Sequence, residues 1–258
     1  MESKKKVLII GNVIAVFATI IVNALANIIP IGGNYTGDIS DNIPNLFVPA
    51  GLTFAIWGVI YVLIFCFAIY QLADLFGKIE TSKDYVNKIS FWFILGSIGN
   101  IIWIFLWHYE QILLSMIPIL VLFFSLLMAY LRLDIGKSTA PKKERYFIQL
   151  PISVYFGWLT VATIANVTAV LVTLDVGGLI LGEVVWTVLV ILVAMIITLL
   201  VIYQRHDVGY SLVIIWALLG IIIKQYGSYQ MIIITAGVAA AIIAVFLLYN
   251  VVKRRQVI

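Results

Sequence analysis

Residues 147–172 read FIQLPISVYFGWLTVATIANVTAVLV and contain no charged side chain. A helix needs about 17–25 apolar residues to cross roughly 30 Å of hydrocarbon, and this stretch is long enough. It is continuously apolar, without the alternation of polar and apolar residues that marks the strands of a membrane barrel. It therefore predicts a transmembrane helix.

Seven further runs have a similar length and composition. The whole chain is 64% hydrophobic and 11% charged, whereas a soluble domain averages about 45–50% apolar and about 25% charged residues. A soluble protein of this length could not bury so much apolar surface, so lipid must cover part of it. We predict an all-α membrane protein with about eight transmembrane helices, at residues 7–27, 51–73, 90–107, 112–131, 147–172, 183–203, 210–226 and 230–250.

The basic residues lie on one side of this topology. Fifteen of the 16 Lys and Arg residues precede the first run or follow the second, fourth, sixth or eighth, and only Lys224 falls on the other side. Basic residues in short loops stay cytoplasmic. We therefore predict a multi-pass protein of the cell membrane, with both termini and the loops 74–89 and 132–146 in the cytoplasm. The same distribution explains the net charge of +4 without a nucleic-acid partner.

The first run has a second interpretation. Lys4–Lys6, an apolar stretch and the small residues Ala24 and Ala26 imitate a signal peptide with its cleavage site. The apolar stretch exceeds the ~7–15 residues of the apolar core of a signal peptide, which favours a transmembrane helix. Cleavage would leave seven helices in the same orientation.

Residues 28–50 form the one long outer loop. They contain Gly and Pro residues, which break helices, and no Lys or Arg. Their apolar residues, including Leu46 and Phe47, leave two interpretations open: a lid over a ligand, or a solvated connector. The other outer loops are short, around His108–Gln111 and Asp175–Gly178.

Ionisable side chains are missing from the middle of every predicted helix. Ion-coupled pumps and proton relays usually carry one, so the pattern disfavours a proton-coupled transporter. Cys66 is the only cysteine, which excludes an intramolecular disulfide, and His108 and His206 are too distant in sequence to suggest a metal site. The spacing supports no catalytic triad, so we expect a protein that is not an enzyme. Four side chains at the outer edge are expected to be solvated: Asp38, Asp41, His108 and Glu110.

Aromatic, small and amide side chains share faces of three predicted helices. An amide in lipid is costly unless it is paired, so these faces should point toward other helices. They favour either a pocket for a flat apolar ligand or ordinary helix packing with Trp at the membrane interfaces. The faces are Phe54, Trp57 and Tyr61 on the second helix, Asn100, Trp103 and Trp107 on the third, and Trp158, Ala162 and Asn166 on the fifth.

The fifth-helix face resembles a signature of the TspO/MBR family, the tryptophan-rich sensory proteins related to the mitochondrial translocator protein. The family pattern is P-Y-L-x-W-x-x-F-A-x-x-L-N. Tyr155, Trp158, Ala162 and Asn166 fall in register with it. Val, Val and Ala stand at positions 154, 161 and 165, where the family has Pro, Phe and Leu.

Two further motifs resemble the same family. Residues 99–103 read GNIIW and resemble L-N-x-x-W, with Trp107 in place of the second Phe of a following F-F pair. On the second helix, Pro49, Trp57 and Tyr61 resemble P-x7-W-x3-Y. The three matches occur in the expected order, each on the expected helix.

The resemblance places a five-helix TspO/MBR-like bundle at residues 1–172 and three additional transmembrane helices at residues 173–258, as in a longer bacterial branch. It implies a receptor or sensor that binds a tetrapyrrole-like, lipid-like or sterol-like molecule in the bundle. Porphyrin or haem would be a ligand and not a resident cofactor, and a homodimer stays open. The alternative function is a transporter or permease component for a neutral or lipidic small molecule. The candidate ligand-binding residues are Trp57, Tyr61, Asn100, Trp103, Trp107, Trp158, Ala162 and Asn166.

The first loop departs from the family. Short members carry W-Y-x-x-L-x-K-P-x-W-x-P-P there, whereas residues 31–50 contain no Trp and no Lys. Loop contacts to tetrapyrroles therefore cannot be carried over, and we expect no porphyrin-degrading activity.

Overall fold

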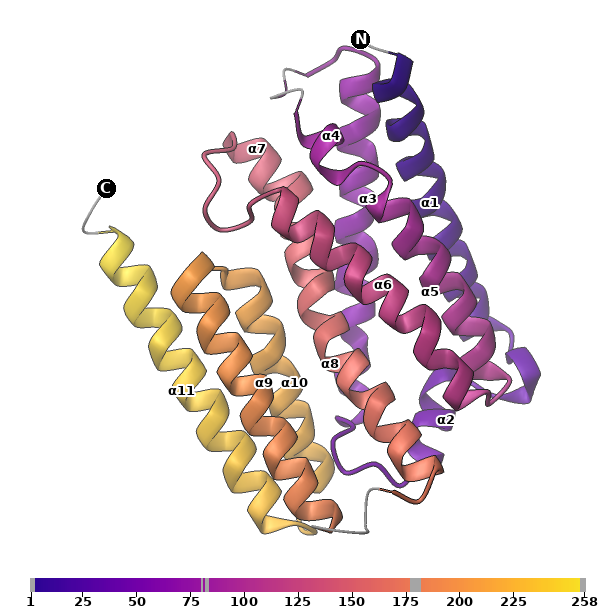
Figure 1. The fold of residues 1–258 in the computed structure, drawn as a ribbon, viewed down its shortest axis with the longest axis vertical. Coiled ribbons are helices and arrows are strands. Elements are labelled where there is room, and N and C mark those ends of the chain that lie inside the picture. The colour runs from indigo at the N-terminus through magenta and orange to yellow at the C-terminus, as the bar shows by residue number, and fades with distance from the viewer. Residues whose placement is uncertain (1–2, 80, 82–83, 177–181, 256–258) are drawn as a thin grey trace. The chain divides into compact units, whose positions relative to one another are not determined.

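The computed structural model describes residues 3–79, 81, 84–176 and 182–255 (Figure 1). Each of the eight predicted runs forms a helix, and the described residues contain no strand, which confirms the all-α membrane fold. The long helices are α1 (Ser3–Ile28), α3 (Ile56–Leu75), α5 (Trp92–His108), α6 (Ile112–Arg132), α8 (Leu150–Thr173), α9 (Glu183–Arg205), α10 (Val208–Gln225) and α11 (Gln230–Arg255).

The lengths of these helices suit a bilayer. Within the described residues, seven helical segments are long and apolar enough to cross a membrane. The eighth, α5, has 17 residues. It would rise about 25 Å, close to the lower limit for a span. The seven long segments and this shorter helix correspond to the eight predicted spans.

Short helical segments occupy several connections. The π-helical turn η3 leads directly into α8, whose second residue is Pro151. Proline has no N–H to donate to the preceding turn, and its ring crowds the carbonyl four residues earlier, which accounts for a widened turn there. Lys83 and residues 177–178 of a predicted outer loop lie outside the described residues. The short segments are η1 (Ile31–Gly33), α2 (Thr36–Asn42), η2 (Gly51–Ala55), α4 (Tyr85–Ile89), α7 (Lys142–Glu144) and η3 (Arg145–Gln149).

Contacts divide the chain into two compact units. Unit 1 comprises Met1–Ile39 and Trp57–Phe156, and unit 2 comprises Ser40–Ile56 and Gly157–Ile258. The division passes through α8. The sequence-based boundary at residue 172, between the five-helix bundle and the three additional helices, rests on the family pattern and not on these contacts. It stays a prediction.

In unit 1, α5 packs against both α1 and α6. Figure 1 shows α5 and α6 side by side. Gly99 of α5 permits the close approach, since a Cβ there would lie 2.8 Å from the carbonyl oxygen of Pro118 in α6. Small residues let membrane helices pack backbone to backbone in this way.

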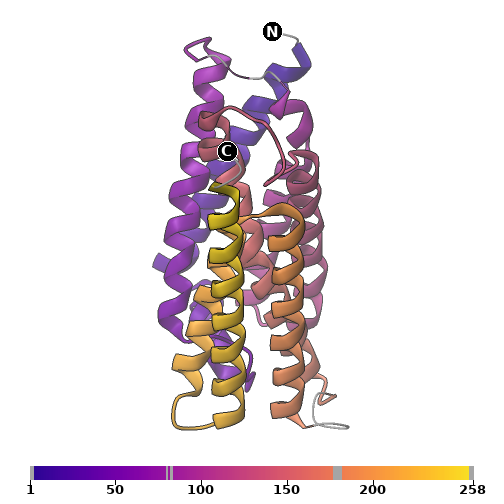
Figure 2. The ribbon, with the colours of Figure 1, turned by 90° about the vertical axis from the view of Figure 1, so that its left-hand side faces the viewer.

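In unit 2, α9, α10 and α11 pack side by side (Figures 1 and 2). The turn between α9 and α10 is tight: His206 adopts a left-handed conformation, and the Asp207 carboxylate caps α10 by accepting from the Tyr210 N–H at 3.3 Å. Gly220 lets the chain segment before α3 pack closely on α10, since a Cβ there would overlap the Thr53 hydroxyl.

Candidate functional site

Three of the predicted ligand-binding residues meet in unit 1. The Asn23 amide of α1 donates to Asn100 Oδ1 at 2.6 Å, and the Asn100 amide donates to the Tyr155 hydroxyl at 3.2 Å. Asn100 and Tyr155 are buried. The Trp57 ring meets Tyr155 edge to face at 5.9 Å and stacks on Tyr61 at 5.7 Å. In this cluster the amide of Asn100 links three helices, and the aromatic faces contact one another.

Trp103 and Trp107 form a second aromatic pair at the far end of α5. Their rings stack at 5.3 Å, and Trp107 Nε1 donates to the Thr36 carbonyl oxygen at 3.2 Å. His108, beside them, is only 1% exposed, with its ring nitrogens near the Ile104 carbonyl oxygen (2.8 Å) and the Thr36 hydroxyl (3.2 Å). The expectation that His108 is solvated is therefore wrong, because α2 covers it.

Trp158, Ala162 and Asn166 lie on the part of α8 that belongs to unit 2. Trp158 is buried and meets Phe54 edge to face at 5.7 Å. Asn166 is buried and Ala162 is half-buried. The eight predicted residues thus divide between the units, and a single site made of all eight stays a prediction.

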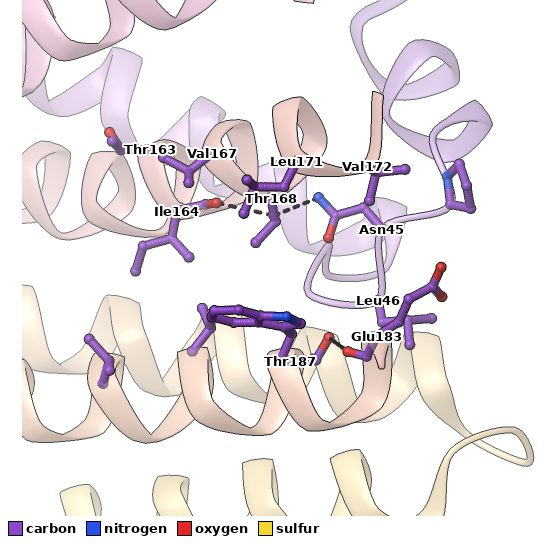
Figure 3. A pocket seen from close by; sticks show the side chains of 14 residues that line it. Asn45, Leu46, Thr163, Ile164, Val167, Thr168, Leu171, Val172, Glu183 and Thr187 are labelled. Atoms are coloured by element: carbon purple, nitrogen blue, oxygen red, sulfur yellow. Dashed lines mark hydrogen bonds between the residues drawn. The ribbon is translucent and has the colours of Figure 1, made fainter. Parts of the chain in front are cut away.

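An apolar pocket of about 310 Å³ lies in unit 2, between α8, α9 and the chain segment around Asn45 (Figure 3). Ligand pockets in proteins commonly measure about 300–1,000 Å³, so this volume is at the lower end of the range. None of the eight predicted residues lines it. Its lining residues are Pro44, Asn45, Leu46, Thr163, Ile164, Val167, Thr168, Leu171, Val172, Glu183, Trp186, Thr187, Val190 and Val193.

Polar side chains lie along the pocket, with Asn45 and Glu183 at one end and Thr163 at the other (Figure 3). The Asn45 amide donates to the Thr168 hydroxyl at 2.7 Å and to the Ala165 carbonyl oxygen at 3.0 Å. The remaining walls are mainly aliphatic side chains and the Trp186 indole. Both Asn45 amide hydrogens are already used, so the pocket suits a mainly apolar molecule whose polar group would face Glu183.

Residues 28–50, the loop predicted to lie outside, form part of this pocket wall through Pro44, Asn45 and Leu46. The Gln225 amide of α10 donates to the Leu46 carbonyl oxygen at 2.9 Å, and the Ala50 N–H donates to the Gly220 carbonyl oxygen at 3.0 Å. Lys224, the one basic residue on the outer side of the predicted topology, pairs with Asp41. These contacts fix the segment against α8 and α10, so the solvated-connector interpretation is wrong for this half of the loop.

The sequence contained a weak sign of the pocket. Thr163, Val167 and Leu171 follow the i, i+4, i+8 spacing of one helix face. At 3.6 residues per turn, this face lies about 100° around α8 from the face of Ala162 and Asn166. Because it carries no aromatic or amide side chain, it could not be told from a face that meets lipid.

A charged cluster at one end of unit 1 was also missed. Lys5 Nζ lies 2.8 Å from an Asp74 carboxylate oxygen, and both side chains are buried. Asp74 also accepts from the Tyr85 hydroxyl at 2.9 Å and from the Thr81 hydroxyl at 3.0 Å. Burial, and then the Asp74 carboxylate, raise the pKa of Tyr85 above its ordinary value, so the phenol stays protonated and donates.

Comparison with known proteins identifies one family. The model of a family described as "TSPO-like protein" matches residues 8–249. The match covers all or most of each of the eight apolar helices, the last three included. No curated protein and no solved structure matches the chain.

Proposed function

Since the chain belongs to the TSPO-like protein family, we propose that it is a membrane receptor or sensor that binds a hydrophobic small molecule among its helices, without chemical conversion. The observation that carries the proposal is the pocket between α8 and α9, with its mainly aliphatic walls and a few polar side chains. This combination is typical of small-molecule sites, in which apolar area supplies affinity and polar groups fix orientation.

The volume of the pocket indicates the size of the ligand. A cavity of about 150 Å³ is large enough to bind benzene. The pocket of about 310 Å³ is twice as large, so by proportion it would enclose roughly two aromatic rings, or ~12 non-hydrogen atoms. A porphyrin, with four pyrrole rings, would insert only one edge. We therefore expect a two-ring aromatic or a slender lipidic molecule to bind better than a porphyrin.

A pocket-filling substitution tests the proposal. Val167 lines the pocket and is 38% exposed, and Val185 lies on α9 outside the lining with 39% exposure. We expect Val167→Phe to weaken binding of 2-naphthol at least tenfold, and the matched Val185→Phe to leave it unchanged. Equilibrium dialysis gives the affinity directly, and thermal shift provides a check, since specific binding raises apparent stability. Equal binding by both variants would place the ligand elsewhere.

Reconstituted vesicles separate this function from the alternatives. A receptor binds 2-naphthol or protoporphyrin without net uptake, and the ligand is recovered unchanged by mass spectrometry. Saturable uptake that Val167→Phe abolishes would instead favour the transporter. A modified ligand would indicate an enzyme.

A further inference from the structure

Buried polar side chains follow one face of α1. Lys5, Asn12, Thr19 and Asn23 are spaced by seven, seven and four residues, which places them on the same side of the helix. From Lys5 to Asn23 this face extends about 27 Å along the helix axis. In unit 1 it meets α3 at Asp74 and Gln71, and α5 at Asn100.

The Asn12–Gln71 pair is incompletely hydrogen-bonded. The Asn12 amide donates to Gln71 Oε1 at 3.0 Å, and both side chains are 0% exposed. Among the described residues, neither Asn12 Oδ1 nor Gln71 Nε2 has a partner. Exchanging oxygen and nitrogen in both amides would still leave one donor and one acceptor unused, so the result does not depend on how the amides are assigned.

The same face of α1 carries a third unused group. The Thr19 hydroxyl, two turns further along α1, is buried and has no partner within the described part of the chain. Buried polar groups in folded proteins are paired with protein or with ordered water, because an unpaired one loses its hydration without compensation. A buried water typically makes about three hydrogen bonds to such groups.

We propose that unit 1 holds an internal water site between α1 and α3, at Asn12 and Gln71. The water accepts a hydrogen bond from Gln71 Nε2 and donates one to Asn12 Oδ1. Any other occupant must likewise be small and combine an acceptor with a donor, and water is the molecule that fits this description in a membrane.

The Lys5–Asp74 ion pair lies beside this site. On α3, Asp74 follows Gln71 by one turn, and on α1, Lys5 precedes Asn12 by two turns. Ile9 and Val16, on either side of Asn12, are fully buried. Ile9 and Val16 therefore close the site along α1 on both sides of Asn12.

Site-resolved NMR tests the proposal in lipid bilayers. In protein labelled with ¹⁵N at Asn and Gln side chains, magnetisation selected on water should transfer to Gln71 Nε2. The matched control is the buried Asn23 amide, whose two hydrogens are used by the Thr19 carbonyl oxygen at 2.8 Å and by Asn100 Oδ1 at 2.6 Å. We expect transfer to Gln71 several-fold stronger than to Asn23, and equal transfer would overturn the proposal.

A substitution identifies the groups that hold the water. Asn12→Leu removes the acceptor and should reduce transfer to Gln71 several-fold. Asn27→Leu, on an exposed part of the same helix, should leave it unchanged. Unchanged transfer in Asn12→Leu would show that Asn12 does not hold the water and would also overturn the proposal.

Discussion

The interiors of the two units differ in how they fill space. In unit 1, the α1, α3 and α5 interfaces are closed by side-chain amides, a tyrosine and an ion pair. In unit 2, α8 and α9 leave a pocket lined mainly by aliphatic side chains. An amide in lipid must find a partner on another helix, and finding it draws the helices together. In unit 1 the amides therefore link one helix to another, whereas in unit 2 the space between α8 and α9 is lined mainly by apolar side chains.

The largest expected effect concerns the orientation of unit 1. Lys5 lies over the Tyr85 ring at 5.8 Å, and the Arg132 guanidinium donates to the Lys88 carbonyl oxygen at 2.7 Å, so basic residues gather at one end of the unit. Basic segments stay cytoplasmic. In a Cys66→Ala background, Thr139→Cys should be labelled by an impermeant maleimide only after the cells are opened.

The control for orientation lies at the other end of unit 1. Tyr109 is exposed at the end of α5, so Tyr109→Cys should be labelled in intact cells. Labelling of Thr139→Cys from outside intact cells would reverse the topology.

The next largest effect concerns the charged cluster of unit 1. The Lys5 and Asp74 side chains are 9% and 8% exposed. Lys5→Met leaves a buried carboxylate without its cation, which typically costs on the order of 3 kcal/mol of folding free energy. Detergent-denaturation midpoints measure the loss.

An exposed ion pair provides the matched control. Lys88 and Asp84 lie 3.2 Å apart with side chains 41% and 59% exposed. Lys88→Met should change stability by less than about 1 kcal/mol, because exposed pairs are screened by solvent. If Lys5→Met and Lys88→Met lowered the folding free energy equally, burial would not strengthen the Lys5–Asp74 ion pair.

A smaller effect concerns the amides. Asn100→Leu removes the partner of the Asn23 amide and of the Tyr155 hydroxyl, and should cost about 1–2 kcal/mol. Asn166→Leu should have a similar effect because Asn166 is buried. Asn250 bonds within its own helix, to the Phe246 carbonyl oxygen, so Asn250→Leu should be tolerated. Unchanged midpoints in both Asn100→Leu and Asn166→Leu would show that these two amides do not hold helices together.

The sequence predicted the helices well because hydrophobic length alone sets them in a membrane. It also predicted correctly that Asn100 and Asn166 are buried, since an amide avoids lipid. It did not predict that Asp74 pairs with Lys5, because an acidic residue at the end of an apolar run is equally compatible with water. Helical spacing shows which residues share a face of α8, but it does not show which helix faces them or whether a void remains.

The central claim is that a hydrophobic ligand binds against Trp186 in the pocket of unit 2, and not among the aromatic rings of unit 1. Fluorine NMR of 5-fluorotryptophan-labelled protein, titrated with 2-naphthol, tests it most directly, with each signal assigned by a single Trp→Phe variant. We predict a saturable shift of the Trp186 signal while the signals of Trp57, Trp103 and Trp107 stay unchanged. A saturable shift of those three signals, with Trp186 unaffected, would contradict the claim.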